Sequence, residues 1–115
     1  MKKELLFSML SAVAANNKEG YTVDAATLQP ITKGYSVAVA ATQNSFGPEG
    51  LARVIEYAKT HKEVNAFGGW FNTDNGLYYY DATIVISSLA DALELGRSAG
   101  QLAIFDLENC KEIRL

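Results

Sequence analysis

Cysteine and histidine are almost absent from this chain, since Cys110 and His61 are the only examples among 115 residues. One cysteine cannot form an intramolecular disulfide, and these two side chains cannot complete a structural zinc site. We therefore expect no structural zinc and no cofactor, and a fold that survives chelators. A lone thiol also fits a reducing cytoplasm, which is the localisation that we expect.

The shortage of histidine also limits the catalytic schemes that the chain can support. His61 is expected at the end of a helix, where the helix dipole favours its charged form, so a surface cap is a simpler interpretation than a catalytic base. The serines lack a G-x-S-x-G context, and no Walker-type or dinucleotide-binding glycine pattern occurs. The sequence therefore identifies no catalytic residue and favours a protein that is not an enzyme.

Long apolar runs and a large net charge are missing as well. No segment is long enough to cross a bilayer, so we expect no membrane partner. The net charge is −3, and a weakly acidic chain lacks the attraction that drives binding to a phosphate backbone, which disfavours nucleic acid as a partner. With 49% hydrophobic and 20% charged residues, the composition is that of one globular domain over residues 1–115.

The N-terminal segment allows two interpretations. Lys2 and Lys3 precede an apolar run that ends in small residues, as in a secretory signal. Glu4 interrupts the basic region, however, and apolar residues recur at the spacing of an amphipathic helix, namely Leu6, Met9, Leu10 and Val13. We expect a helix at residues 2–16, and the sequence leaves open whether this segment is a cleaved signal in the native host.

Apolar periodicity and turn residues predict the other elements. Extended segments are expected at residues 21–24, 27–31, 35–42, 64–71, 77–87, 101–107 and 111–115, with helices at residues 48–61 and between Ser88 and Gly100. The order α-β-β-α-β-β-α-β-β predicts an α+β domain with an antiparallel sheet of about five or six strands, covered on one face by three helices. Pro30 favours a sheet edge for its segment.

The dipeptide Asn75-Gly76 predicts a hairpin between residues 64–71 and 77–87. Gly68-Gly69 in the first of these strands indicates a bulge or a close approach of another backbone segment. In the second strand, alternate residues are expected to face the core, namely Tyr78, Tyr80, Ala82, Ile84 and Ile86.

The same hairpin is rich in aromatic residues, which are Phe67, Trp70, Phe71, Tyr78, Tyr79 and Tyr80. Alternation places some of them on each face of the sheet, and one face of a two-layer fold meets solvent or a partner. Trp and Tyr are favoured anchors at protein interfaces, so Trp70 and Tyr79 are candidate binding residues. The alternative that all of these rings belong to the core remains open.

Asp81 is a charged residue in the middle of this aromatic strand. Such a residue either points to solvent or is placed for a function, and solvent exposure is the simpler interpretation. We retain Asp81 as a candidate binding residue, because a carboxylate in a pocket could take part in acid and base chemistry or bind a small ligand.

A polar loop precedes the helix that Pro48 is expected to start. Gln43, Asn44 and Ser45 lie there, where the free N–H groups of a helix N-terminus can bind an acidic group of a ligand or partner. Helix capping by Asn44 or Ser45 is the competing explanation, because each helix start needs donors and acceptors to be satisfied.

Several strings resemble small uncharacterised proteins from phages and conjugative elements of gut bacteria. They are Thr27-Leu28-Gln29-Pro30, Gly34-Tyr35-Ser36-Val37-Ala38, Thr42-Gln43-Asn44-Ser45-Phe46-Gly47, Gly68-Gly69-Trp70, Tyr79-Tyr80-Asp81-Ala82 and Ala103-Ile104-Phe105-Asp106-Leu107. The likeness covers nearly all of the chain after the first helix. It implies an accessory role in a mobile element, in which small acidic proteins often bind other proteins, and it supplies no catalytic residue.

The sequence thus favours a non-enzymatic accessory module that binds a protein partner or associates with itself. One alternative is a DNA-mimicking inhibitor of a nucleic-acid enzyme, which would need a dense carboxylate surface. The other is a small-ligand binder or minor enzyme that uses Asp81 and the neighbouring tyrosines, which a deep apolar pocket and a perturbed carboxylate would favour.

Overall fold

The computed structural model describes residues 2–115 of the chain. The helices are α1 (Lys3–Asn16), α2 (Gly47–Thr60) and α3 (Leu89–Ser98), with a single 3₁₀ turn, η1 (Ala40–Thr42), before α2. The strands are β1 (Tyr21–Asp24), β2 (Tyr35–Ala38), β3 (Ala66–Asn72), β4 (Leu77–Ile86), β5 (Ala103–Asp106) and β6 (Lys111–Arg114).

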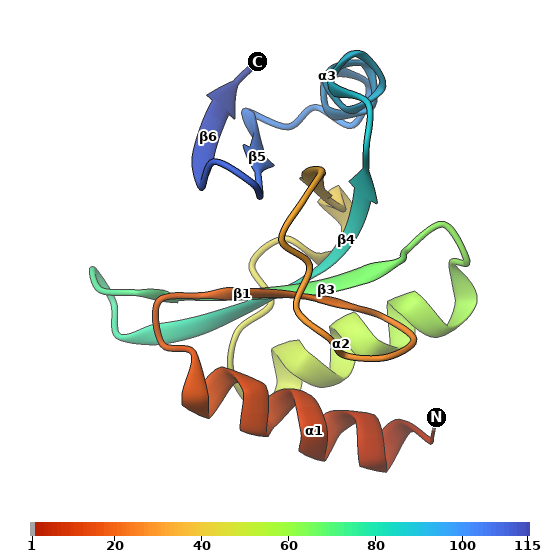
Figure 1. Ribbon diagram of the computed structural model, residues 1–115. Coiled ribbons are helices and arrows are strands. Elements are labelled where there is room, and N and C mark those ends of the chain that lie inside the picture. Colours follow the sequence, from red (N-terminus) through yellow and green to blue (C-terminus); the bar gives the residue numbers. More distant parts are fainter. Residues whose placement is uncertain (1) are drawn as a thin grey trace.

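The strands form one six-stranded sheet in the order β1-β3-β4-β2-β5-β6. Each neighbouring pair is antiparallel, as expected for an α+β domain. Helices α1 and α2 lie along the end of the sheet made by β1, β3 and β4, whereas α3 lies with β5 and β6 at the other end (Figure 1). The sheet twists strongly between these ends, so that β5 and β6 rise away from the plane of β1 and β3 (Figure 1).

The predicted hairpin is confirmed, because β3 and β4 pair from Ala66↔Thr83 to Asn72↔Leu77. This register is one to one, so the bulge expected at Gly68-Gly69 is wrong. A close approach does occur at Gly69, but side chains and not backbone make it. Aromatic rings make that approach: a Cβ on Gly69 would lie 2.4 Å from Cε1 of Tyr21 and 2.8 Å from Cε1 of Tyr78. Glycine is needed here because these rings occupy the space of a side chain.

Two clusters of buried apolar residues lie on the helix-covered face of the sheet. The larger packs Leu10 of α1 and Leu51 of α2 against Phe67, Tyr80 and other residues of the sheet. The smaller, under α3, is built from Val37, Ala92 and Ile104, with Ile86 packed against it. The expectation that the even-numbered residues of β4 face the core is therefore confirmed for Tyr78, Tyr80, Ala82 and Ile86.

The strand predicted at residues 35–42 is too long. It ends at Ala38, and residues 40–42 turn into η1 instead. The reason is the buried Thr42 hydroxyl, which accepts a hydrogen bond from the Ala82 amide at 3.2 Å and replaces the next bond of the sheet. The chain thereby leaves the sheet and can enter α2.

The extended segment predicted at residues 27–31 is mostly a turn. Asp24 accepts hydrogen bonds from the amides of Ala26 and Thr27, and Leu28 adopts a positive φ of 60°. Only Pro30 bridges Val23, at the outer edge of β1, where a residue without an N–H is tolerated. Beyond this edge the chain must return across the sheet to reach β2 on the far side of β4.

Two apolar residues of the helices remain largely outside the core. Met9 on α1 is 38% exposed and Leu89 on α3 is 41% exposed. Their neighbours Leu10 and Ala92 carry the packing of these helices instead, since both are fully buried. Each helix therefore contacts the sheet through a narrower stripe than its apolar pattern predicts.

Candidate functional site

The face of the sheet opposite the three helices is the candidate site. Alternation places Trp70 of β3 and the odd-numbered residues Tyr79, Asp81 and Thr83 of β4 on this open face. Of the candidate residues identified from the sequence, Trp70, Tyr79 and Asp81 are thus brought to one surface.

Three aromatic rings contact one another in a row on this face, and we call them the aromatic ladder: Trp70, Tyr79 and Phe46. The rings of Trp70 and Tyr79 are 5.0 Å apart between centroids and nearly parallel, with 17° between their planes. Phe46 lies on the other side of Tyr79 at 5.5 Å, because the residue before α2 bridges β4. Trp70 and Phe46 remain 44% and 45% exposed, so the ladder is a surface feature and not part of the core.

The loop before α2 does not behave as a cap. The helix begins after Phe46 without a side-chain hydrogen bond, so the capping interpretation of Asn44 and Ser45 is wrong. Ser45 is buried: its carbonyl accepts from the Tyr80 amide at 2.8 Å, and its hydroxyl has no partner.

Gln43 and Asn44, the other candidate residues of this loop, are not buried with Ser45. Asn44 and Gln43 are exposed, and the Gln43 amide lies 3.4 Å from the Gln101 side chain, towards α3. The structure therefore does not bring Gln43, Asn44 and Ser45 together into a site, and a recognition role for them stays a prediction.

Beside the aromatic ladder lies a groove of about 820 Å³. The sheet forms its floor through small residues, including Thr22, Ser36 and Gly68. Ile31 and Thr32 line it from the segment that returns across the sheet, and Phe105 and Glu112 line it from the end made by β5 and β6. Trp70 belongs to both the groove and the aromatic ladder, so the two form one continuous surface.

Asp81 lies on the groove floor directly opposite Gly68 in the register of β3 and β4. The open face predicted for Asp81 is right, but free exposure to solvent is wrong. Burial raises the pKa of its carboxyl group from 3.8 to about 6, and neither a hydrogen bond nor a nearby charge offsets this effect. A partly dehydrated carboxylate without a counter-ion is costly to keep ionised.

The charge of the groove has one sign. Its lining includes the carboxylates of Glu19, Asp81 and Glu112 but no lysine, arginine or histidine. Glu112 has a partner outside the lining, Arg114, whose Nε lies 3.3 Å from it in an exposed pair. The carboxylates around Asp81 therefore favour a positive charge in this groove.

The tyrosines near Asp81 are divided by the sheet. Tyr78 and Tyr80 lie on the core side, and only Tyr79 shares the open face with Asp81. The hydroxyl of Tyr79 accepts a hydrogen bond from the Asn75 amide group at 2.9 Å. An acid–base arrangement of Asp81 with several tyrosines is therefore not assembled on either face.

His61 and Cys110 occupy unrelated positions. His61 is the residue after α2, where its ring stacks on Tyr57 with centroids 3.7 Å apart and its Nδ1 lies 2.9 Å from the Tyr57 carbonyl oxygen. Cys110 is exposed and lines the far end of the groove. Among residues 2–115 no group of three or more His, Cys, Asp or Glu side chains could hold a metal ion.

Sequence reasoning missed several residues of this surface, namely Phe46, Phe105, Glu19 and Glu112. A polar loop before a helix gave no signal that Phe46 would bridge β4. Phe105 and Glu112 reach the groove only because β5 pairs with β2, a contact between segments about seventy residues apart.

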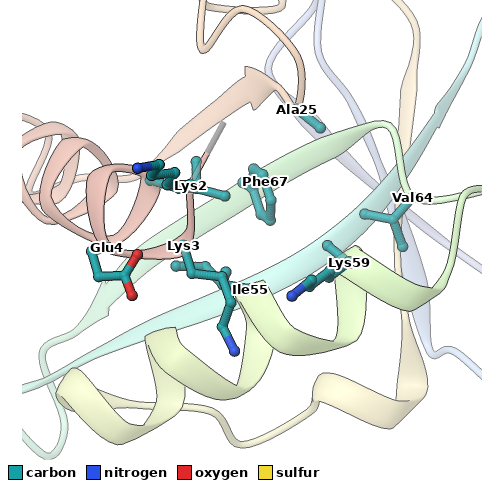
Figure 2. A pocket seen from close by; sticks show the side chains of 10 residues that line it. Lys2, Lys3, Glu4, Ala25, Ile55, Lys59, Val64 and Phe67 are labelled. Atoms are coloured by element: carbon teal, nitrogen blue, oxygen red, sulfur yellow. The ribbon is translucent and has the colours of Figure 1, made fainter.

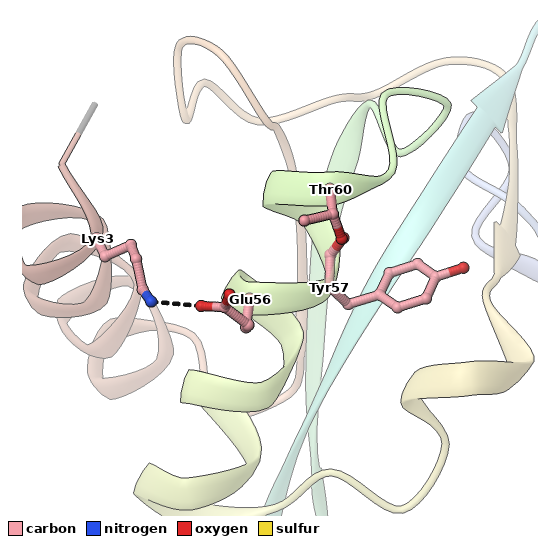
Figure 3. A network of polar contacts seen from close by, with 4 residues as sticks. All are labelled: Lys3, Glu56, Tyr57 and Thr60. Atoms are coloured by element: carbon pink, nitrogen blue, oxygen red, sulfur yellow. Dashed lines mark hydrogen bonds and ion pairs between the residues drawn. The ribbon is translucent and has the colours of Figure 1, made fainter.

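A second hollow of about 480 Å³ lies between α1 and α2 on the other side of the sheet. Figure 2 shows Phe67 pointing into it from β3, with Lys3 and Ile55 from the two helices beside it. Lys3 and Glu56 form an ion pair across its rim (Figure 3), and this hydrogen bond raises the pKa of Lys3 and lowers that of Glu56. The hollow is therefore a gap in the packing between α1 and α2.

For residues 2–115, no helix combines the length and the apolar character needed to cross a bilayer. No protein family, no curated protein and no solved structure matches this chain. The geometry of the open face is therefore the basis for any functional assignment.

Proposed function

We propose that this chain is a non-enzymatic binding module that docks a basic segment of a partner protein on its open sheet face. The observation that carries the proposal is the continuity of the aromatic ladder with a groove whose charged lining residues are all acidic. A positively charged segment complements that groove, and the exposed rings provide apolar contact area beside it.

The aromatic ladder has the properties of an interface anchor. Trp70 stacks on Tyr79 across the hairpin, and Phe46 contacts Tyr79 at a tilt of 60°. These contacts restrict the rings, so little side-chain entropy is lost when a partner covers them. Trp70 and Phe46 each keep nearly half of their surface exposed, which gives a partner apolar area to bury. Aromatic faces also attract cations, which adds to the preference for lysine or arginine.

An accessory protein of a phage or conjugative element, which the resemblance implies, would use such a surface to dock on a host or element protein. A DNA-mimicking inhibitor would also meet a basic protein surface. Its carboxylates would have to follow the spacing of phosphates, however, whereas those of the groove are gathered within one concave face.

A labelled peptide tests this proposal. We would titrate the protein with a fluorescent nonapeptide of alternating lysine and valine, and with a matched peptide of alternating glutamate and valine, at about 0.05 M salt, where the electrostatic contribution is large. The lysine peptide should bind and the glutamate peptide should not. Trp70→Ala should weaken binding at least about tenfold, as expected for an anchor residue.

Phe71→Ala is the matched control, because Phe71 is 40% exposed but lies on the opposite face of the same strand. It should leave binding unchanged, and Trp70→Ala should lower the melting temperature no more than Phe71→Ala does. Equal binding of the two peptides, or equal effects of the two substitutions, would exclude docking on the open face. A dimer of the free protein that Trp70→Ala dissociates would identify a second copy as the occupant instead.

A small-ligand binder is the second candidate, because the groove has a volume typical of ligand sites and contains a perturbed carboxylate. Native mass spectrometry of the protein purified from its host would reveal a retained small molecule. Its displacement by the lysine peptide would show that both occupy the groove.

A further inference from the structure

From the position of Asp81 we infer that the groove floor is a subsite for one cationic side chain, an ammonium or guanidinium group, in which Asp81 is the counter-ion. The inference rests on the proposed function and names the group within the basic segment that the groove recognises. It identifies Asp81 as the residue that determines specificity, whereas the aromatic ladder provides contact area.

The geometry of the floor leaves room in front of the carboxylate. Gly68 faces Asp81 across the β3–β4 pair, and Thr22 continues the same row on β1. Because Gly68 has no side chain, the space beside Asp81 stays open to the groove. Thr83 lies on the same face two residues along β4, and a Cβ on Gly68 would be 3.4 Å from its hydroxyl. A cation above Asp81 therefore has a carboxylate and hydroxyl oxygens within one pocket.

Within residues 2–115, no cationic side chain pairs with Asp81. The groove lining contains no cationic side chain. Lys18, Lys33 and Lys111 adjoin lining residues in the sequence but do not line the groove, and Arg114 pairs with Glu112. The other charged groups that line the groove, Glu19 and Glu112, are also acidic and would favour an incoming cation. A partly dehydrated carboxylate that lines the groove without a cationic neighbour in the lining favours an incoming cation.

The titration of Asp81 supports the same conclusion. Burial alone raises its pKa to about 6, so a bound cation should return the pKa towards its ordinary value and release protons near pH 6. The charged and titratable groups in the lining, Glu19, Glu112, Tyr21 and Cys110, provide no positive charge that would do this without a ligand.

Small side-chain analogues test the subsite without knowledge of the partner sequence. We would add n-butylammonium, n-propylguanidinium, butyrate or butanol at up to about 100 mM to ¹⁵N-labelled protein at pH 7.5, and follow backbone amide shifts. Such small analogues are expected to bind with millimolar affinity, so the shifts report the contacts of the charged or polar group with the groove floor. The two cations should shift the amides of Gly68, Asp81 and Thr83, whereas butyrate and butanol should not.

Asp81→Asn is the decisive variant, because it keeps the shape of the side chain and removes its charge. In this variant, butylammonium should shift the amides no more than butanol does. Glu112→Gln, at the groove rim, should keep most of the difference between the shifts that the two compounds cause. For the native protein, the apparent affinity for butylammonium should fall about tenfold from pH 7.5 to pH 5 as Asp81 becomes protonated.

Cation-induced shifts that persist in Asp81→Asn, or that are absent from the native groove, would overturn the subsite. Binding of the lysine nonapeptide that Trp70→Ala weakens would still support the docking proposal in that case. Failure of both measurements would reject the two proposals together.

Discussion

Gly68 and Gly69 are adjacent in β3 and opposite in their surroundings. A Cβ on Gly69 would lie 2.4 Å from the Tyr21 ring, on the core side of the sheet. A Cβ on Gly68 would meet Thr83, the Tyr21 carbonyl and Asp81 at 3.4–3.9 Å, on the open side. Gly69 thus makes room for the core, and Gly68 makes room for the groove.

This difference predicts opposite results for two alanine substitutions. Gly69→Ala should lower the free energy of unfolding by about 1–3 kcal/mol, because the rings of Tyr21 and Tyr78 must move. Gly68→Ala should change it by less than about 1 kcal/mol, since ordinary contacts replace a flexible glycine. Urea unfolding of both variants measures this, and Gly68→Ala should also weaken the butylammonium shifts. Equal destabilisation would contradict the assignment of the two faces.

Asp81 predicts an unusual dependence of stability on pH. Its pKa rises from 3.8 to about 6 on folding, so between these values the folded state holds more protons than the unfolded state. The free energy of unfolding should therefore fall as pH rises through this window, by about 3 kcal/mol for a shift of about two units.

Asp81→Asn should remove this loss, so that the variant gains stability relative to the native protein at pH 7.5 but not at pH 4. Urea unfolding at both pH values measures the comparison. Asp106→Asn is a suitable control, because hydrogen bonds from Asn109 lower the pKa of that exposed carboxyl group and the effect should have the opposite sign. Identical pH profiles for native protein and Asp81→Asn would show that Asp81 is not dehydrated.

Ser45 and Ser88 predict different costs for the same substitution. The Ser88 hydroxyl caps α3 by accepting from the Asp91 amide at 3.3 Å, so Ser88→Ala should cost about 1 kcal/mol. The Ser45 hydroxyl is buried without a partner, and Ser45→Ala should be neutral or stabilising. Thermal unfolding of both variants tests this, and a loss of about 1 kcal/mol or more for Ser45→Ala would reveal a partner for its hydroxyl.

The hydroxyl group of Tyr78 is expected to make the free energy of unfolding depend on pH in alkaline solution. It donates to the Asn17 carbonyl at 2.8 Å, at the end of α1, and burial raises its pKa from 10.0 to about 12. The unfolded chain therefore loses this proton first, and the free energy of unfolding should fall as pH rises above 10. Tyr78→Phe should weaken that dependence and cost about 1 kcal/mol at neutral pH. An unchanged alkaline transition would place the effect on another tyrosine, such as Tyr21.

Local patterns were sufficient where short-range chemistry decides the outcome. Asn75-Gly76 closes the hairpin, Ser88 caps α3, and alternation along β4 separates Tyr80 from Tyr79. The order of helices and strands also followed from periodicity, since each element depends on neighbours within a few residues. The strand order did not, because β1 pairs with β3 and β2 pairs with both β4 and β5.

Only the tertiary structure decided which residues form the candidate site. The sequence by itself determined that Tyr79 and Asp81 share one face of their strand, because alternation is a property of the strand. The pairing of Trp70 with Tyr79 in the register of β3 and β4 brings Trp70 to the same face. The sequence could not determine that Phe46 would join Tyr79, that β5 would bring Phe105 beside Ser36, or that Asp81 would be shielded. Burial and charge complementarity arise from contacts between distant segments, and those contacts depend on how the whole sheet pairs and twists.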